Sequence, residues 1–212
     1  MKLGIVCGLK SERAVLSGVD AQFFISGANA QRAREGAAML VSSGIEALVS
    51  FGISGAVRPG LEPGTLLLPD TIMNDDGECF QTSELPGVGV PDPAFGSDAL
   101  ITSAAAKAQL SAHWGVASVD MESHAVADAA RAARLPLYVL RAIADTAEQS
   151  LPPSAQGAVR PDGSINTLKT LIGLFRRPQD LAKLMTLGRQ SAAGHEALRR
   201  EGRRLIEELA ER

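Results

Sequence analysis

Short apolar runs, most of them ending at a glycine or an acidic residue, recur along this chain and alternate with segments of helical composition. Runs of this kind are typical of buried strands. Five of them predict strands over residues 2–8, 21–27, 46–52, 116–121 and 137–145. Buried strands separated by helices are typical of proteins whose sheet is covered on both faces. The sequence therefore predicts an α/β fold with a largely buried sheet.

The segments between these strands predict helices and one looser region. Helices are expected over 11–18, 29–44, 97–115 and 123–136. Ser11 and Asn29 are the expected N-caps of the first two, because their side chains can accept a hydrogen bond from a free helical amide. A further strand is expected over 64–73, whereas 74–96 is rich in Gly, Pro, Asp and Ser and predicts a hairpin or loop.

All 212 residues are expected to form a single domain, with 166–212 as a helical C-terminal extension broken near Pro178 and Gly194. Within it, 168–185 sets apolar residues at helical spacing beside basic ones, namely Leu171, Leu174, Phe175, Lys169, Arg176 and Arg177. A basic amphipathic helix can lie on a membrane surface. It can equally pack its apolar stripe against the sheet, and both interpretations stay open.

Composition excludes several classes of protein. The formal net charge is −3, which gives no general attraction to nucleic acid. Two cysteines make no disulfide framework and suit a reducing cytoplasm. No apolar run is long enough for a transmembrane helix or a signal peptide, so a cytoplasmic protein is expected. The sequence has no metal-ligand spacing, dinucleotide fingerprint or P-loop, so neither a metal nor a cofactor is expected.

Acidic residues stand where two predicted strands end. Ligands of α/β sheets bind beyond the carboxyl ends of the strands, which makes Glu122 and Asp145 candidates for a site. Glu122 could accept two hydrogen bonds from the cis hydroxyls of a ribose, or simply occupy the start of a helix. Asp145 at the edge of an apolar core would have a raised pKa and could act as a general acid, or it could simply form a turn.

Two further stretches could complete such a site. Glu12 follows the first strand, in the first turn of a helix, where a solvated position is the alternative. The run FGISGAV (51–57) predicts a glycine-rich turn in which Ser54 and Gly55 would face a ligand, although many such turns have no ligand.

The motifs together resemble the nucleoside phosphorylase and nucleosidase superfamily. VDMES (119–123) is followed by RAIADTA (141–147), and three further blocks fall in the order typical of that family: LGIVCGLKSE (3–12), SGANA (26–30) and FGISGAV…PGTLLLPD (51–70). The resemblance covers about 1–153. The segment 151–200 is similar to the tail of the hopanoid-associated phosphorylases, the branch linked to removal of adenine from adenosylhopane.

The resemblance implies a three-layer α/β/α fold around a central mixed, largely parallel twisted sheet. It implies that Asp145 protonates the purine at N7 and that Glu12 orients the attacking water. It assigns the ribose to four residues: Glu122, Met121, Ser54 and Gly55. It also implies a homo-oligomer that acts on a small or lipid-linked nucleoside. The basic segment 168–185 leaves open whether this cytoplasmic protein also contacts the inner face of the membrane peripherally.

The sequence leaves two candidates for the nucleophile, namely water and inorganic phosphate as a co-substrate. Arg13, Arg32 and the backbone at Gly27 are the candidates for holding an anion. Glu12 would repel phosphate in the same pocket, so hydrolysis is expected over phosphorolysis. A non-enzymatic nucleoside-binding protein is the third alternative, but it would have no use for Asp145.

Overall fold

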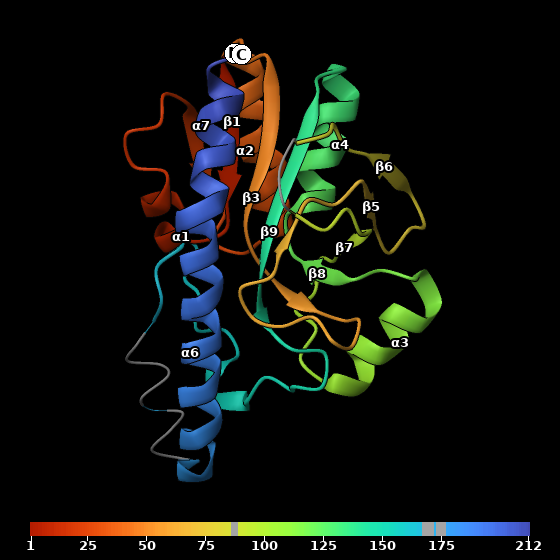
Figure 1. The fold of residues 1–212 in the computed structure, drawn as a ribbon, viewed down its shortest axis with the longest axis vertical. Helices are drawn as coiled ribbons and strands as arrows, with labels where there is room; N and C mark the ends of the chain where they lie inside the picture. The colour runs from red at the N-terminus through yellow and green to blue at the C-terminus, as the bar shows by residue number, and fades with distance from the viewer. Residues whose placement is uncertain (86–88, 167–171, 173–176) are drawn as a thin grey trace.

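A central sheet covered by helices on both faces forms the core of the protein (Figure 1). The computed structural model describes residues 1–85, 89–166, 172 and 177–212. Within that part the strands are β1 (Leu3–Cys7), β2 (Gln22–Ile25), β3 (Ala47–Ala56), β4 (Leu66–Leu67), β5 (Thr71–Met73), β6 (Cys79–Gln81), β7 (Ala94–Gly96), β8 (Ser118–Asp120) and β9 (Leu137–Asp145). The helices are α1 (Lys10–Val15), α2 (Ala30–Ser42), α3 (Ala104–Trp114), α4 (Ser123–Ala133), α6 (Leu181–Ala197) and α7 (Arg203–Ala210).

The sheet is mixed, as the sequence predicts. Its strands run in the order β2-β1-β3-β8-β7-β5-β6, while β9 pairs with β3 and β4. The pairs β1–β2, β1–β3, β3–β9, β5–β7 and β7–β8 are parallel, and β3–β8, β4–β9 and β5–β6 are antiparallel. The parallel ends of β1, β3 and β9 point the same way, which gathers the residues that follow them at one edge of the sheet.

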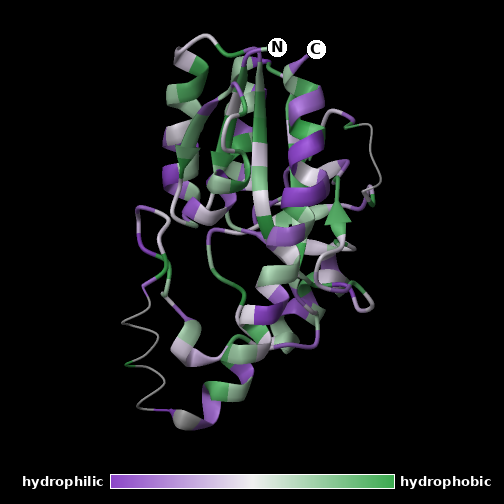
Figure 2. Ribbon diagram, turned by 60° about the vertical axis from the view of Figure 1, so that its left-hand side comes forward, coloured by the Kyte–Doolittle hydropathy of each residue, from purple (hydrophilic) through white to green (hydrophobic). Residues whose placement is uncertain are grey.

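Two apolar layers explain why the central strands lack a polar face. On one side, α1, α6, α7 and the turn between the last two pack on Leu3, Ile5 and Phe51. On the other side, α2 and α4 pack on Val6 and Leu48. Figure 2 shows the resulting apolar strands between helices that are partly polar. The three-layer α/β fold predicted from the sequence is confirmed.

Several boundaries differ from the predicted ones. α1 begins at Lys10 with Leu9 as its N-cap residue, so Ser11 lies inside the helix and does not cap it. α2 does begin after Asn29, whose side chain accepts the amide of Arg32. α3 begins at Ala104 after Ser103 as its cap and not at 97, because the preceding residues form a loop along the cavity described below.

The predicted glycine-rich turn at 51–57 is instead the last part of β3. It pairs with β9 as far as Gly55 and carries one register shift between Ser54 and Gly55. The expected strand 64–73 is divided into β4 and β5, and the expected loop 74–96 contains β6 and β7.

The described residues from Pro178 to Ala210 are helical, and Gly194 lies inside α6 without interrupting it. A 3₁₀ turn, Pro178–Asp180, precedes α6, which agrees with a break near Pro178. The irregularity expected at Gly194 lies further on, as a π-helical turn over Leu198–Gly202. Both termini lie at one end of the molecule (Figures 1 and 2), where the Met1 amino group donates to Ala210 O at 2.8 Å.

The amphipathic segment expected over 168–185 lies largely outside the described residues, which exclude Lys169, Leu171, Leu174, Phe175 and Arg176. Of the helices that the structure describes, none is both long enough and apolar enough to cross a membrane.

Candidate active site

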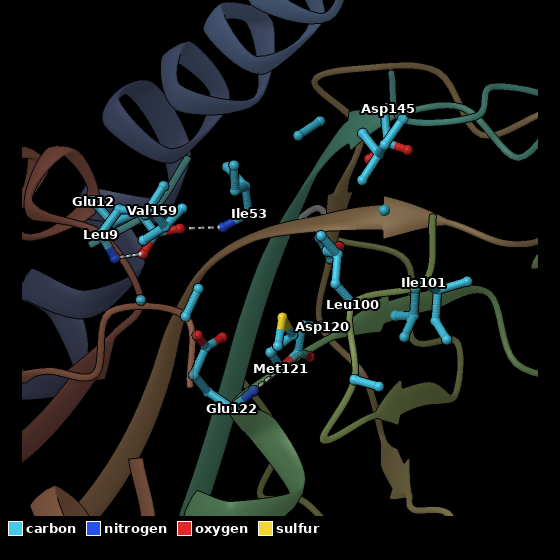
Figure 3. A pocket seen from close by; sticks show the side chains of 18 of the residues that line it. Leu9, Glu12, Ile53, Leu100, Ile101, Asp120, Met121, Glu122, Asp145 and Val159 are labelled. Atoms are coloured by element: carbon cyan, nitrogen blue, oxygen red, sulfur yellow. Dashed lines mark hydrogen bonds between the residues drawn. The ribbon is translucent and has the colours of Figure 1, made fainter. Parts of the chain in front are cut away.

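A cavity of about 190 Å³ opens at the edge of the sheet where β1, β8 and β9 end. β3 contributes the wall below it with Ile53, Ser54 and Gly55. Apolar side chains form much of the remaining lining, namely Leu9, Leu100, Ile101, Val119, Leu151 and Val159. Figure 3 shows carboxylates entering this apolar enclosure from several elements.

Three carboxylates predicted from the sequence line this one cavity. Glu12 comes from α1, Glu122 from the junction of β8 and α4, and Asp145 from the last position of β9. Glu12 and Glu122 lie close together beside Gly8, since a Cβ built there would be 2.8 Å from Glu122 Oε1 and 3.4 Å from Glu12 Oε2. Asp145 lies apart from them, beyond Met121 and Leu100 (Figure 3). The cavity therefore has two acidic regions.

Glu12 is buried and held by the backbone. Its carboxylate accepts the amide of Leu9 at 2.8 Å and the amide of Ile53 at 2.8 Å. Burial raises the pKa of Glu12, and these two hydrogen bonds oppose the rise. A Cβ at Gly52 would lie 2.6 Å from Glu12 Oε1, so only glycine there leaves room for the carboxylate.

Glu122 is also buried and accepts a hydrogen bond from Ser26 Oγ at 3.3 Å. Burial raises the pKa of Glu122 to about 8, against the effect of Arg141, whose guanidinium lies 3.8 Å away. Asp120 and Glu12 add to the rise because their negative charges disfavour a further one. The group can therefore change its charge near neutral pH.

Arg141 is the buried cation beneath these acids, and it was not among the residues predicted from the sequence. Its Nη2 donates to Ser50 Oγ at 2.6 Å and to Asp120 Oδ1 at 3.1 Å. Although burial raises the pKa of Asp120, this partner and the amides of Glu122 and Ser123 hold it below its usual value overall. The signal was present, because an Arg inside an otherwise apolar strand needs a buried partner.

Asp145 has its own cation, Lys107 of α3, which was also missed. Lys107 Nζ donates to Asp145 Oδ2 and, at 2.8 Å, to the carbonyl of Thr146. Burial raises the pKa of Asp145, and Lys107 opposes the rise. A Cβ at Gly55 would lie 3.0 Å from Asp145 Oδ1. No sequence signal pointed to Lys107, because a Lys in an alanine-rich helix is typical of a solvated face.

The chain matches a known family model over most of its length. The model of the Phosphorylase superfamily matches residues 5–107 and 93–174. The chain belongs to the phosphorylase superfamily.

Solved structures agree with this assignment in their fold. The chain superposes on a 5′-methylthioadenosine/S-adenosylhomocysteine nucleosidase from Helicobacter pylori with a TM-score of 0.68 and 15% identity, covering 98% of each chain. The futalosine hydrolase of the same species gives 0.69 and 14%, covering 99% of this chain and 98% of that one. A nucleosidase from Colwellia psychrerythraea in complex with adenine gives 0.66 and 17%, covering 82% and 96%. No curated protein matches the sequence.

The other residues predicted for this site divide into those that line the cavity and those that do not. Met121, Ser54 and Gly55 line the cavity together with Glu122. The hydroxyl of Ser54 is buried and has no hydrogen-bond partner among the described residues.

The three residues expected to hold an anion do not line the cavity. The Arg13 guanidinium lies 3.6 Å from the centre of the Phe23 ring and donates to Leu16 O. Arg32 Nε donates to Ser26 O at 2.8 Å. Gly27 has a positive φ of 72°, and its neighbour Ala28, not Gly27 itself, reaches the cavity. The described lining therefore holds a single cation, Lys107.

Proposed function

We propose that this protein cleaves the N-glycosidic bond of a purine nucleoside by hydrolysis. The observation that carries the proposal is the meeting of Glu12, Glu122 and Asp145 in one cavity, each with a glycine opposite its carboxylate. Membership of the phosphorylase superfamily and the fold shared with nucleosidases support the same class of reaction. A nucleoside-binding protein without activity would need no acid at the purine end of the cavity.

Each carboxylate has a separate task in this reaction. Asp145 delivers a proton to the purine at N7, which makes the base a better leaving group as the bond from N9 to the sugar breaks. The sugar passes through an oxocarbenium-like state, as in other glycoside cleavages. Glu122 accepts hydrogen bonds from the ribose hydroxyls and favours the developing positive charge, while Met121 packs against the sugar.

Glu12 takes the proton of the attacking water. Its two backbone hydrogen bonds fix the carboxylate near Glu122 and away from Asp145 (Figure 3). With the base at Asp145 in the proposed binding mode, Glu12 faces the opposite side of the sugar. Burial raises the pKa of Glu12, which strengthens it as a base. Attack of water at C1′ then gives a free sugar and a neutral purine.

Hydrolysis is favoured over phosphorolysis by the charges around the cavity. Phosphate needs donors and positive charge, and the described lining offers only Lys107, which already binds Asp145. A phosphate dianion near Glu12 and Glu122 would meet two carboxylates. Phosphorolysis remains the second candidate, because the superfamily model carries the name of that reaction.

Adenosylhopane is the substrate we propose within this class. The proposal rests on the similarity of 151–200 to the hopanoid-associated branch, and the apolar Leu9, Leu151 and Val159 support a lipid-linked 5′ group. We also propose that the protein is a cytoplasmic homo-oligomer that contacts the membrane peripherally. It would need no cofactor, and inorganic phosphate would be a co-substrate only in the case of phosphorolysis.

Product analysis tests the reaction. A soluble 5′-alkyl adenosine is incubated with the protein, with and without phosphate, and adenine, free sugar and sugar 1-phosphate are measured. Hydrolysis predicts free sugar in both samples and a loss of about 10²-fold or more in Glu12→Gln. Sugar 1-phosphate formed only with phosphate would establish phosphorolysis. Binding of the nucleoside without any product would indicate a binding protein.

A further inference from the structure

We propose that Lys107 and Asp145 act as one acid, in which Lys107 holds the proton that the purine receives through Asp145. The proposal rests on the proposed cleavage of an N-glycosidic bond, and it assigns the source of the proton within that site.

The position of Lys107 is the first ground. Its side chain is 1% exposed and contacts the cavity, while the Asp145 side chain is 12% exposed. The ammonium group is therefore shielded from bulk water and lies between the Asp145 carboxylate and the Thr146 carbonyl, at the end of β9. Burying a lysine at this place is costly unless its charge has a task or a partner there.

The hydrogen bonds of Lys107 are the second ground. Of the three N–H groups, one goes to Asp145 Oδ2 and one to the Thr146 carbonyl. The described residues provide no third acceptor. The Thr146 carbonyl fixes the amine independently of Asp145, so the amine stays in place when the carboxyl group changes its charge.

The separation of charges is the third ground. Arg141 forms its ion pairs with Asp120 and Glu122, whereas Lys107 pairs with Asp145. We therefore treat Lys107 and Asp145 as a separate pair that has one proton to donate. In the proposed resting state Asp145 is ionised and the Lys107 ammonium carries the proton, so the proton that reaches the purine comes from the nitrogen.

As the bond between C1′ and N9 breaks, its electron pair enters the purine. Lys107 Nζ passes its proton to the Asp145 carboxylate, and the same proton moves on from Asp145 Oδ to N7, so Asp145 is ionised again at the end of the step. Lys107 ends as a neutral amine. The attacking water forms the new C–O bond and gives one proton to Glu12. That proton leaves to solvent and a solvent proton restores Lys107, so the net reaction consumes one water.

The test compares Lys107→Met and Lys107→Arg with the wild type and with Lys183→Met, a control on the exposed face of α6. We measure kcat and KM for a 5′-alkyl adenosine over roughly pH 5 to pH 10 and check folding by circular dichroism. Lys107→Met should lose about 10²-fold in kcat with little change in KM. Lys107→Arg should not recover the activity, because a guanidinium keeps its proton.

A readout independent of turnover separates this proposal from the proposed function. In protein carrying ¹³C-labelled aspartate, Asp145 should be ionised at neutral pH in the wild type and protonated in Lys107→Met. Asp145 protonated in the wild type, or full activity in Lys107→Arg, would overturn the proposal, since Lys107 would then only position Asp145. Absence of turnover in the wild type would refute the cleavage reaction, while the titration of Asp145 would still decide whether the pair holds one shared proton.

Discussion

Replacing Arg141 by Met removes the cation that balances the buried acids beneath the cavity. In the folded protein its guanidinium lies 3.1 Å from Asp120 and 3.8 Å from Glu122, and both it and Asp120 have side chains only 1% exposed. Removing one partner of a buried ion pair costs about 3–5 kcal/mol, because the other charge stays buried without a counter-charge. This is a large share of the ~5–15 kcal/mol that holds a typical domain folded.

The cost should depend on pH, and its sign follows from the direction of the pKa shifts. In the wild type the pKa of Asp120 is lowered, so its contribution to stability is present above the unfolded pKa and is lost as pH falls through the folded pKa. Without Arg141, burial raises that pKa above the unfolded value, and the contribution is then lost as pH rises. The difference between the two proteins should therefore grow with pH, by up to ~1.4 kcal/mol per unit for Asp120.

Urea unfolding at pH 5 and pH 8 measures this difference. We expect Arg141→Met to lose several kcal/mol at pH 8 and clearly less at pH 5, and Asp120→Asn in the same chain to recover part of the loss. Arg204→Met, which removes an exposed Arg 3.7 Å from Glu208, should change stability by less than about 1 kcal/mol. An equal loss at both pH values would refute the argument, because the cost would then come from packing and not from charge.

Two other predictions concern the residues around the acids. Gly52→Ala should displace Glu12 from both backbone amides, and it should therefore lower stability by about 3 kcal/mol or more and also lower kcat. Gly188→Ala, which has open space around the added Cβ, should change neither. A Gly52→Ala variant that is stable and active would contradict the geometry. Because the pKa of Glu122 is raised to about 8 and the ionised form binds ribose, nucleoside affinity measured by calorimetry should increase up to about tenfold per pH unit between pH 6 and pH 8. A Glu122→Gln variant that kept this pH dependence would show that another group is responsible.

The sequence predicted the parts of the fold that local pattern determines. β9 runs over Leu137–Asp145 as expected, because an apolar run interrupted only by Arg141 follows Pro136 and ends at an acid. Glu122 and Asp145 could be singled out because the ends of buried strands converge at one edge of the sheet, and Glu12 because it follows the first strand.

The remaining features depend on contacts between distant segments. Lys107 meets Asp145 only because α3 packs beside the end of β9, which no spacing in the sequence indicates. The Gly52–Gly55 segment stays in β3 because it pairs with β9, and pairing overrides the tendency of glycine to turn. Arg13 was a candidate for holding phosphate because it directly follows Glu12 in the sequence, but its side chain stacks on the Phe23 ring instead.

The most direct test is the rate at which the wild type and Asp145→Asn release adenine from a saturating 5′-alkyl adenosine in buffer without phosphate. The affinity of each protein for the same nucleoside is measured in parallel. The account predicts steady release by the wild type, a fall of about 10²-fold or more in the variant, and similar affinities. Equal rates for the two proteins, or no release by the wild type, would contradict it.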